Sequence, residues 1–248
     1  RDGKKYSNLS IKDNVGKRNT GTLINFLPDP SYFDSSKFSV VRLKHLLRAK
    51  AVLCSGLTVV FEDETASNKN ESKYVWHYED GLKSYLSSEL SDKELVLANP
   101  FYGSAEGEGE EAEWAVQWQT HNDEALSESY VNLIPTSQGG THVNGLRTGL
   151  VDALREFCEF RNLLARGIKI APEDVWKNCN FVLSIKMIDP QFAGQTKERL
   201  NSRQAFAFVS GAVKDYFSLW LNQNTEEAEA IAALAIENAQ DRIKAGKK

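Results

Sequence analysis

A polar loop between a strand pattern and a long helix pattern constrains this 248-residue chain more than any other feature. Residues 181–188 are mostly apolar, which predicts a buried strand, and a helical pattern begins near Arg203. The loop between them reads Asp189-Pro190-Gln191-Phe192-Ala193-Gly194-Gln195-Thr196-Lys197. A short loop can hold one amide and one ammonium rigidly, and both groups suit a phosphate. The same residues also fit an ordinary surface loop with a solvated lysine.

The rest of the chain mixes strand and helix patterns, which predicts an α/β (α+β) fold. Alternating or apolar runs predict further strands at 6–11, 22–26, 57–61, 74–78, 101–102, 113–119 and 129–134. Apolar residues at helical spacing predict helices at 39–53, 80–90, 142–160, 171–177, 203–223 and 225–244. Within 113–119, Trp114, Val116 and Trp118 alternate with smaller or polar residues, which predicts one buried aromatic face.

Composition limits the possible functions. Hydrophobic residues make up 41% of the chain, enough for a core, and no apolar run approaches the ~20 residues that span a bilayer. The net charge of −4 is not that of a freestanding nucleic-acid binder, so any DNA contact needs a local basic patch. The cysteines and histidines are scattered without metal-ligand spacing, so we expect no metal site within this chain.

Three stretches, in the same order along the chain, carry a family resemblance. They are Gly16-Lys17-Arg18-Asn19-Thr20-Gly21-Thr22, the run 130–147 (YVNLIPTSQGGTHVNGLR), and Pro190-x-Phe192-x-x-Gln195-Thr196-Lys197. Together they resemble the B subunits of bacterial type IIA topoisomerases, and their amino-acid sequences are more similar to the topoisomerase IV B subunit than to gyrase B. Three collinear motifs are far more specific than a single glycine pattern.

The resemblance implies a domain organisation and an activity. Residues 1–80 are expected to form the C-terminal portion of a GHKL-type ATPase domain. Residues 81–248 are expected to form a transducer domain, a ribosomal-S5-domain-2-like unit with long C-terminal helices. The implied activity is ATP-driven DNA strand passage, in which the transducer senses the γ-phosphate and couples it to closure of a gate.

The resemblance also implies roles for particular residues. Gln195 and Lys197 correspond to residues that reach the γ-phosphate of ATP, and are the expected catalytic and nucleotide-binding pair. Thr22 and Ile24 correspond to the strand that lines the adenine pocket, where a hydroxyl can bind through water and a β-branched side chain can pack. From spacing alone, Thr22 and Ile24 equally fit two ordinary strand residues.

A third set of residues concerns DNA. Arg147 corresponds to an arginine that faces the central cavity of the dimer, and His142 lies near it, so both are expected to face DNA. An ordinary solvated helix arginine fits Arg147 equally well. Gly139 and Gly140 either form a phosphate nest or provide a strand-to-helix turn with positive φ, and we favour the turn.

The family's cofactors and partners follow from the same resemblance. They are ATP and Mg²⁺, the topoisomerase IV A subunit, a second B subunit that dimerises on ATP binding, and double-stranded DNA, in the cytoplasm and without a membrane. The metal ligands are expected outside this chain, which starts without Met and is expected to be an inactive fragment on its own. Two other interpretations remain open: a gyrase B subunit, and a non-catalytic nucleic-acid-binding module of S5-like fold.

Overall fold

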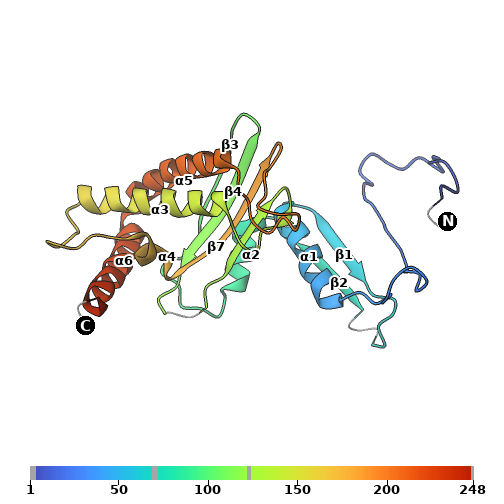
Figure 1. Cartoon of the computed structure of the whole chain (residues 1–248), viewed down its shortest axis with the longest axis horizontal. Helices are drawn as coiled ribbons and strands as arrows, with labels where there is room; N and C mark the ends of the chain where they lie inside the picture. The colour runs from blue at the N-terminus through green and yellow to red at the C-terminus, as the bar shows by residue number, and fades with distance from the viewer. Residues whose placement is uncertain (1–3, 69–71, 122–123, 247–248) are drawn as a thin grey trace. The chain divides into compact units, whose positions relative to one another are not determined.

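The computed structural model describes residues 4–68, 72–121 and 124–246. The chain divides into two compact units, 1–43 and 44–248, and each is described by itself (Figure 1). The helices are α1 (Val40–Leu53), α2 (Gly81–Glu89), α3 (Thr141–Phe160), α4 (Pro172–Trp176), α5 (Arg203–Gln223) and α6 (Thr225–Ala245). The strands are β1 (Thr58–Glu62), β2 (Lys73–His77), β3 (Phe101–Glu106), β4 (Glu110–Trp118), β5 (Ser127–Val131), β6 (Ile134–Pro135) and β7 (Cys179–Met187).

The first unit differs from the sequence-based expectation at two predicted strands. The strands expected at 6–11 and 22–26 do not form, and residues 4–39 contain neither helix nor strand. A strand needs a neighbour to pair its backbone N–H and C=O groups, and no strand within the described residues pairs with these two segments. Their apolar side chains stay in solvent, as shown by Leu23, which keeps 90% of its surface exposed.

The second unit is built on a five-stranded sheet with the order β3-β4-β7-β5-β6. β4 and β7 pair in antiparallel register, with Trp114 opposite Leu183 and Val116 opposite Phe181. β5 runs parallel to β7, and the other neighbours are antiparallel. β1 and β2 form a separate antiparallel pair. The strands expected near 57–61, 74–78, 101–102, 113–119 and 181–188 are therefore confirmed, whereas the one expected at 129–134 is broken by a turn at Asn132 and Leu133, which have positive φ and separate β5 from β6.

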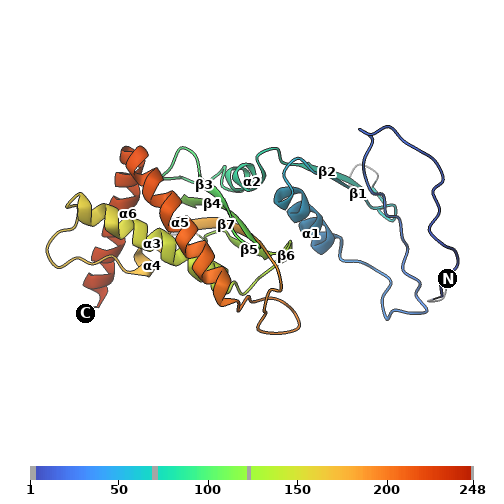
Figure 2. The same ribbon diagram turned by 90° about the horizontal axis from the view of Figure 1, so that it is seen from above.

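Both faces of the five-stranded sheet are covered. Trp114 and Trp118 lie in a large core with α3 and α5, so the expected buried aromatic face of β4 is confirmed. On the opposite face, Ala115 and Val182 pack in a second core with α2 and the C-terminal half of α1. Figure 2 shows α3 and α5 along one side of the sheet and α2 on the other. β4 is thus buried on both sides, which alternation alone did not predict.

The helices α3 and α5 lie unusually close together, and two glycines allow it. A Cβ atom on Gly145 would lie 2.8 Å from the carbonyl oxygen of Phe206, and one on Gly149 would lie 2.8 Å from that of Ser210. These distances are shorter than carbon and oxygen atoms tolerate, so only glycine fits at either position. The close contact holds α5, and the loop before it, against α3.

The C-terminal helices complete the unit. α5 and α6 each have 21 residues and bury one side, which confirms the two long helices expected from the sequence. α6 is joined to α4 through Arg242, whose Nε and Nη2 atoms each lie 2.9 Å from the buried carboxylate of Asp174. Among the helices within residues 4–68, 72–121 and 124–246, none combines the length and the apolar character needed to cross a bilayer.

Candidate functional site

The loop between β7 and α5, here called the switch loop (residues 189–199), is closed at its base by its own backbone. Ala193 N donates to the carbonyl of Arg199 at 2.9 Å, and Asn201 N donates to that of Gln191 at 2.7 Å. Gln191 N also donates to Ser202 Oγ at 2.8 Å, directly before α5. The loop is therefore a narrow hairpin with residues 194–198 at its tip, visible in orange before α5 in Figure 2.

The switch loop is docked on the turn that leads into α3. Leu200, which is 1% exposed, donates its N–H to the carbonyl of Gly139 at 3.0 Å. The carbonyl of Leu200 in turn accepts from Thr141 N at 3.0 Å, and the carbonyl of Glu198 accepts from Gln138 N at 2.9 Å. Two segments far apart in the sequence thus form a short parallel ladder, which ties the loop to the first turn of α3.

The docking explains the paired glycines. Gly139 and Gly140 have φ angles of 62° and 137°, a region that residues with a Cβ atom rarely adopt. A Cβ atom on Gly140 would lie 2.2 Å from the carbonyl oxygen of Leu200. The interpretation of these glycines as a turn that needs positive φ is confirmed.

Gln195 and Lys197 lie at the tip of the switch loop, and both side chains are exposed. Lys197 has a positive φ of 58°, and its N–H donates to the carbonyl of Gly194 at 3.2 Å. Its ammonium lies 5.9 Å from the centre of the Phe192 ring, at the outer limit of a cation–π contact. The loop therefore presents one ammonium and one amide to solvent from a defined turn, an arrangement that suits a phosphate group.

His142 lies in the interior, which does not fit the expectation that it faces DNA. Its side chain is 0% exposed, and Nε2 lies 3.1 Å from Thr136 Oγ1. Thr136 Oγ1 can donate to the carbonyl of Ser129, at 2.9 Å, and can then accept a hydrogen bond from His142 Nε2. His142 Nδ1 has no hydrogen-bond partner. Burial lowers the pKa of the ring to about 4, so the histidine is a neutral core residue below the first turn of α3.

This buried histidine predicts acid sensitivity. The unfolded chain binds a proton at His142 near the ordinary pKa of 6.5, whereas the folded chain resists protonation down to about pH 4. Stability is therefore full above pH 6.5 and is lost as the pH falls toward 4, by about 2 kcal/mol at pH 5. Urea unfolding at pH 7 and pH 5 measures the loss. His142→Gln, which can still donate to Thr136, should show a smaller pH dependence, and an unchanged one would contradict this role.

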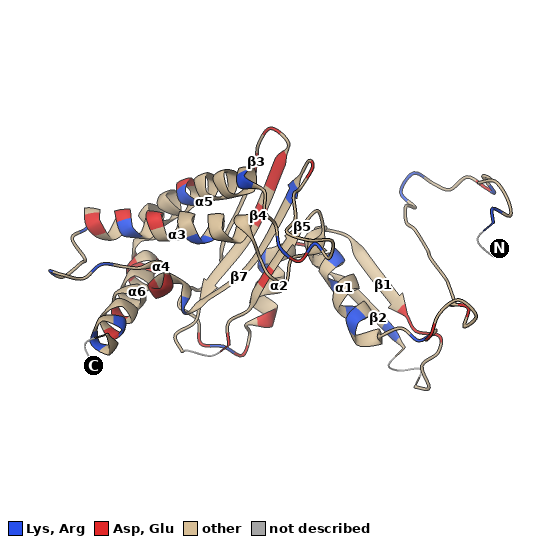
Figure 3. Ribbon diagram, viewed as in Figure 1, with Lys and Arg blue, Asp and Glu red and all other residues tan. Residues whose placement is uncertain are grey.

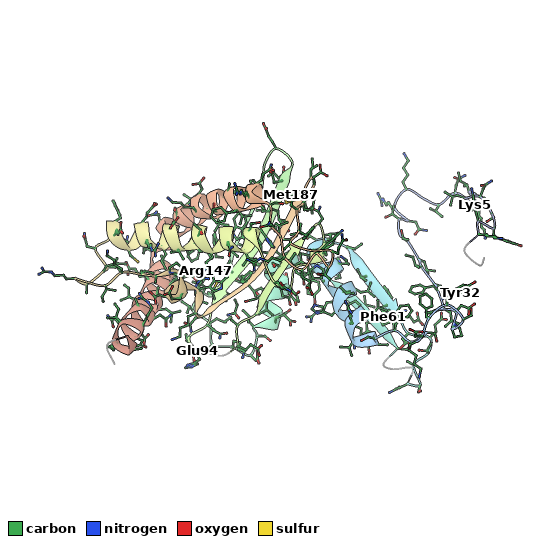
Figure 4. The ribbon with its side chains drawn as sticks, viewed as in Figure 1. Lys5, Tyr32, Phe61, Glu94, Arg147 and Met187 are labelled. Carbon is green, nitrogen blue, oxygen red and sulfur yellow. The ribbon has the colours of Figure 1, made fainter. Side chains whose placement is uncertain are left out.

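Arg147 is on the same helix, one turn further along, and is half-buried. Its guanidinium lies 5.6 Å from the centre of the Trp176 ring, over α4 (Figure 4). Its Nε atom is buried without a hydrogen-bond partner. Figure 3 shows acidic and basic residues interspersed along α3 and α6, whereas the charged residues of α1 are all basic. A contact to DNA through α3 would therefore depend on individual residues such as Arg147.

Thr22 and Ile24 lie in the extended, exposed segment of the first unit. Ile24 keeps 76% of its surface exposed, and the structure does not bring these two residues into a pocket. Their role in an adenine site stays a prediction. Within residues 4–68, 72–121 and 124–246, no group of three or more His, Cys, Asp or Glu side chains is placed to hold a metal ion.

Sequence reasoning missed the residues that hold the site in place. Gln138 lies within the motif at 130–147 and Glu198 directly follows the motif that ends at Lys197, but neither was given a role, and their contact spans 60 positions of sequence. It also missed a polar cluster on the other face of the sheet. There the hydroxyls of Tyr85 and Tyr130 each donate to a different carboxylate oxygen of Glu128, at 2.8 Å. Neither set has a local sequence pattern, because its members come together only in the folded chain.

The sequence of this chain matches a family of known proteins. The sequence model of the family described as DNA gyrase B matches residues 81–248. The B subunit of DNA topoisomerase 4 from Pseudomonas aeruginosa is 61% identical over 247 residues, and the one from Escherichia coli is 55% identical. Both alignments cover 100% of this chain and 39% of the relative, so the chain spans about two fifths of the length of these relatives.

Solved structures agree with the sequence comparison. The topoisomerase IV ATP-binding domain of Francisella tularensis matches with a TM-score of 0.78 and 43% identity, over 98% of this chain and 64% of that one. The 43K ATPase domain of Thermus thermophilus gyrase B matches with a TM-score of 0.76 and 26% identity, over 89% and 58%. The fold of this chain is thus similar to that of ATPase regions from a topoisomerase IV and a gyrase B. The chain belongs to the DNA gyrase B family, so the resemblance and the fold class expected from the sequence are confirmed.

Proposed function

We propose that this chain is part of the ATPase subunit of a type IIA DNA topoisomerase, and that the enzyme is topoisomerase IV. Residues 1–80 would complete the back of a GHKL-type ATPase domain, and residues 81–248 would form the transducer. The observation that carries the proposal is the docked switch loop, whose tip exposes Gln195 and Lys197 while its base is tied to α3. The high identity to topoisomerase 4 B subunits over the whole chain favours topoisomerase IV over gyrase.

The exposed pair would act on the terminal phosphate of ATP. The Lys197 ammonium is a compact charge that can neutralise a phosphate oxygen, and the Gln195 amide can donate to the same group or to a water. When the terminal phosphate is released, Lys197 loses its partner, and the loop is free to move with α3. Gln195 and Lys197 would thus stabilise the reacting phosphate. They would also couple its presence to the position of α3, on which the loop is docked.

The chain would not supply the metal site. Mg²⁺ would neutralise further charge on the phosphates during transfer, in addition to the charge that Lys197 would neutralise. Oxygen ligands in a tight group are needed to hold it, and no such group occurs within the described residues. Other parts of the subunit would provide these ligands, as they would provide most of the adenine pocket around Thr22 and Ile24.

The partners follow from the same assignment. We propose a topoisomerase IV A subunit that cleaves DNA, a second copy of this subunit that closes on ATP binding, and a captured DNA duplex, all in the bacterial cytoplasm. The net charge of −4 and the interspersed charges on α3 and α6 in Figure 3 do not favour the alternative of a freestanding nucleic-acid-binding module.

A reconstitution assay tests the proposal. The full-length subunit that contains this sequence is combined with the A subunit of topoisomerase IV or of gyrase. We expect ATP-dependent separation of linked DNA circles with the topoisomerase IV partner. Introduction of negative supercoils with the gyrase partner alone would assign the chain to gyrase B, and no ATP-dependent change with either partner would contradict the proposed activity.

Arg147 provides a prediction about DNA. In the reconstituted enzyme, Arg147→Gln should lower the DNA-stimulated rate of ATP hydrolysis and leave the basal rate near that of the parent. It should also reduce the salt dependence of DNA binding by about one phosphate contact. Arg147→Lys, which keeps the charge, is the matched control and should retain most of the stimulation. Equal loss of both rates would point to the packing of Arg147 on Trp176 instead.

A further inference from the structure

The conformation of Lys197 needs an external support. Its φ of 58° lies in the left-handed region, which costs a residue with a Cβ atom about 1 kcal/mol or more. Such a conformation persists only where neighbouring contacts hold it. Of the residues around the tip, only Phe192 and Leu200 are more than slightly buried, and both lie at the base of the hairpin. Residues 194–198 must therefore be held by hydrogen bonds.

Besides the turn bond from Lys197 N to the carbonyl of Gly194, these bonds come from Glu198, directly after Lys197. One carboxylate oxygen, Oε2, accepts from Gln138 Nε2 at 3.1 Å and from Thr196 Oγ1 at 3.2 Å. The carbonyl of Glu198 also accepts from Gln138 N at 2.9 Å. One side of Lys197 is thus fixed through Thr196 and the other through the Glu198 backbone. Both attachments lead to Gln138, in the turn before α3.

The negative charge of Glu198 indicates that this side chain has a role other than binding phosphate. An acidic side chain beside a group that binds phosphate repels that phosphate, so its presence at the tip needs another reason. A carboxylate is an acceptor only, and hydrogen bonds to an ionised acceptor are stronger than those to a neutral one. The Glu198 carboxylate can therefore hold two donors at once, Gln138 and Thr196, in addition to the backbone bond from Gln138 N to the Glu198 carbonyl.

We propose that Glu198 is a positioning residue for Lys197. Its carboxylate clamps the tip of the switch loop to the first turn of α3 and so holds the lysine ammonium in its working position. This inference rests on the proposed function, since it concerns the same phosphate-sensing loop. It assigns Glu198 a role through Lys197, without direct contact to the nucleotide.

The test is a set of variants in the full-length subunit, assayed for steady-state ATP hydrolysis with the A subunit and DNA. Glu198→Ala should lower kcat about fivefold to tenfold, as expected when hydrogen bonds to a charged group are lost, with little change in KM. Glu198→Gln keeps an acceptor oxygen and should recover most of the rate. Gln138→Ala removes the other partner and should lower kcat to a similar extent as Glu198→Ala.

A double variant separates positioning from a general structural role. If Glu198 acts through Lys197, then adding Glu198→Ala to Lys197→Ala should cause no further loss. Independent losses that multiply would overturn the proposal, as would a higher rate or a lower KM in Glu198→Ala, which would mean that the carboxylate only repels the nucleotide. An effect of Lys197→Ala without an effect of Glu198→Ala would refute this inference alone. No effect of either would refute the proposed function.

Discussion

Lys197→Ala in the full-length subunit should reduce ATP hydrolysis by ~10²–10³, the scale of losing one preorganised charge that stabilises a reacting group. Lys197 is exposed at the tip of a loop that is anchored at its base, so removing its side chain should not disturb the fold. Nucleotide affinity should fall much less, because the proposed adenine pocket would make separate contacts. Steady-state hydrolysis and binding of a non-hydrolysable ATP analogue measure the two effects independently.

An exposed lysine away from the loop serves as the matched control. Lys169→Ala removes a charge on the same unit, while its carbonyl remains available to Arg242. Hydrolysis by Lys169→Ala should stay close to that of the parent. An unchanged rate in Lys197→Ala would exclude the sensor role, and equal losses in the two variants would indicate a general effect of charge on DNA binding.

Gly149→Ala should lower the stability of the second unit. Alanine normally stabilises a helix interior by about 1 kcal/mol relative to glycine. Here its Cβ would lie 2.8 Å from the backbone carbonyl of Ser210 and 2.9 Å from Val213 Cβ. A backbone carbonyl cannot move without displacing α5, so the clash outweighs the helix propensity. We expect the free energy of unfolding to fall by about 1–3 kcal/mol, the range for overpacked cores, in urea unfolding of the 248-residue chain.

Gly211 in α5 provides the opposite control. Nothing lies within 4 Å of a Cβ atom built on Gly211, so Gly211→Ala should gain helix propensity without a clash. Its unfolding free energy should rise by up to about 1 kcal/mol. If both alanine variants were stabilised, the close approach of α3 and α5 would be wrong.

Local patterns predicted most of the second unit because its elements carry their own signals. The helix at 203–223 was predicted with the bounds that the structure has, since its apolar residues recur at helical spacing. The same reasoning failed for 6–11 and 22–26, where alternation favours a strand but no neighbouring strand pairs with it. A strand is stabilised by its partner, so its pattern is a necessary sign and not a sufficient one.

The switch loop shows most clearly which features follow from local sequence and which follow from tertiary structure. The sequence alone determined that Gln195 and Lys197 follow a strand and precede a helix, and that glycines at 139 and 140 make a turn with positive φ. These properties depend on residue type and on neighbours along the chain.

Only the tertiary structure decided what the loop rests on. It joined Glu198 to Gln138, buried His142 beneath the turn, and brought α5 against Gly149. Each of these contacts involves residues that no local sequence pattern pairs with each other. Their free energy depends on which surfaces meet after folding. The physical reason is that periodicity reports which face of an element is buried, whereas the partner of that face is chosen by packing of the whole unit.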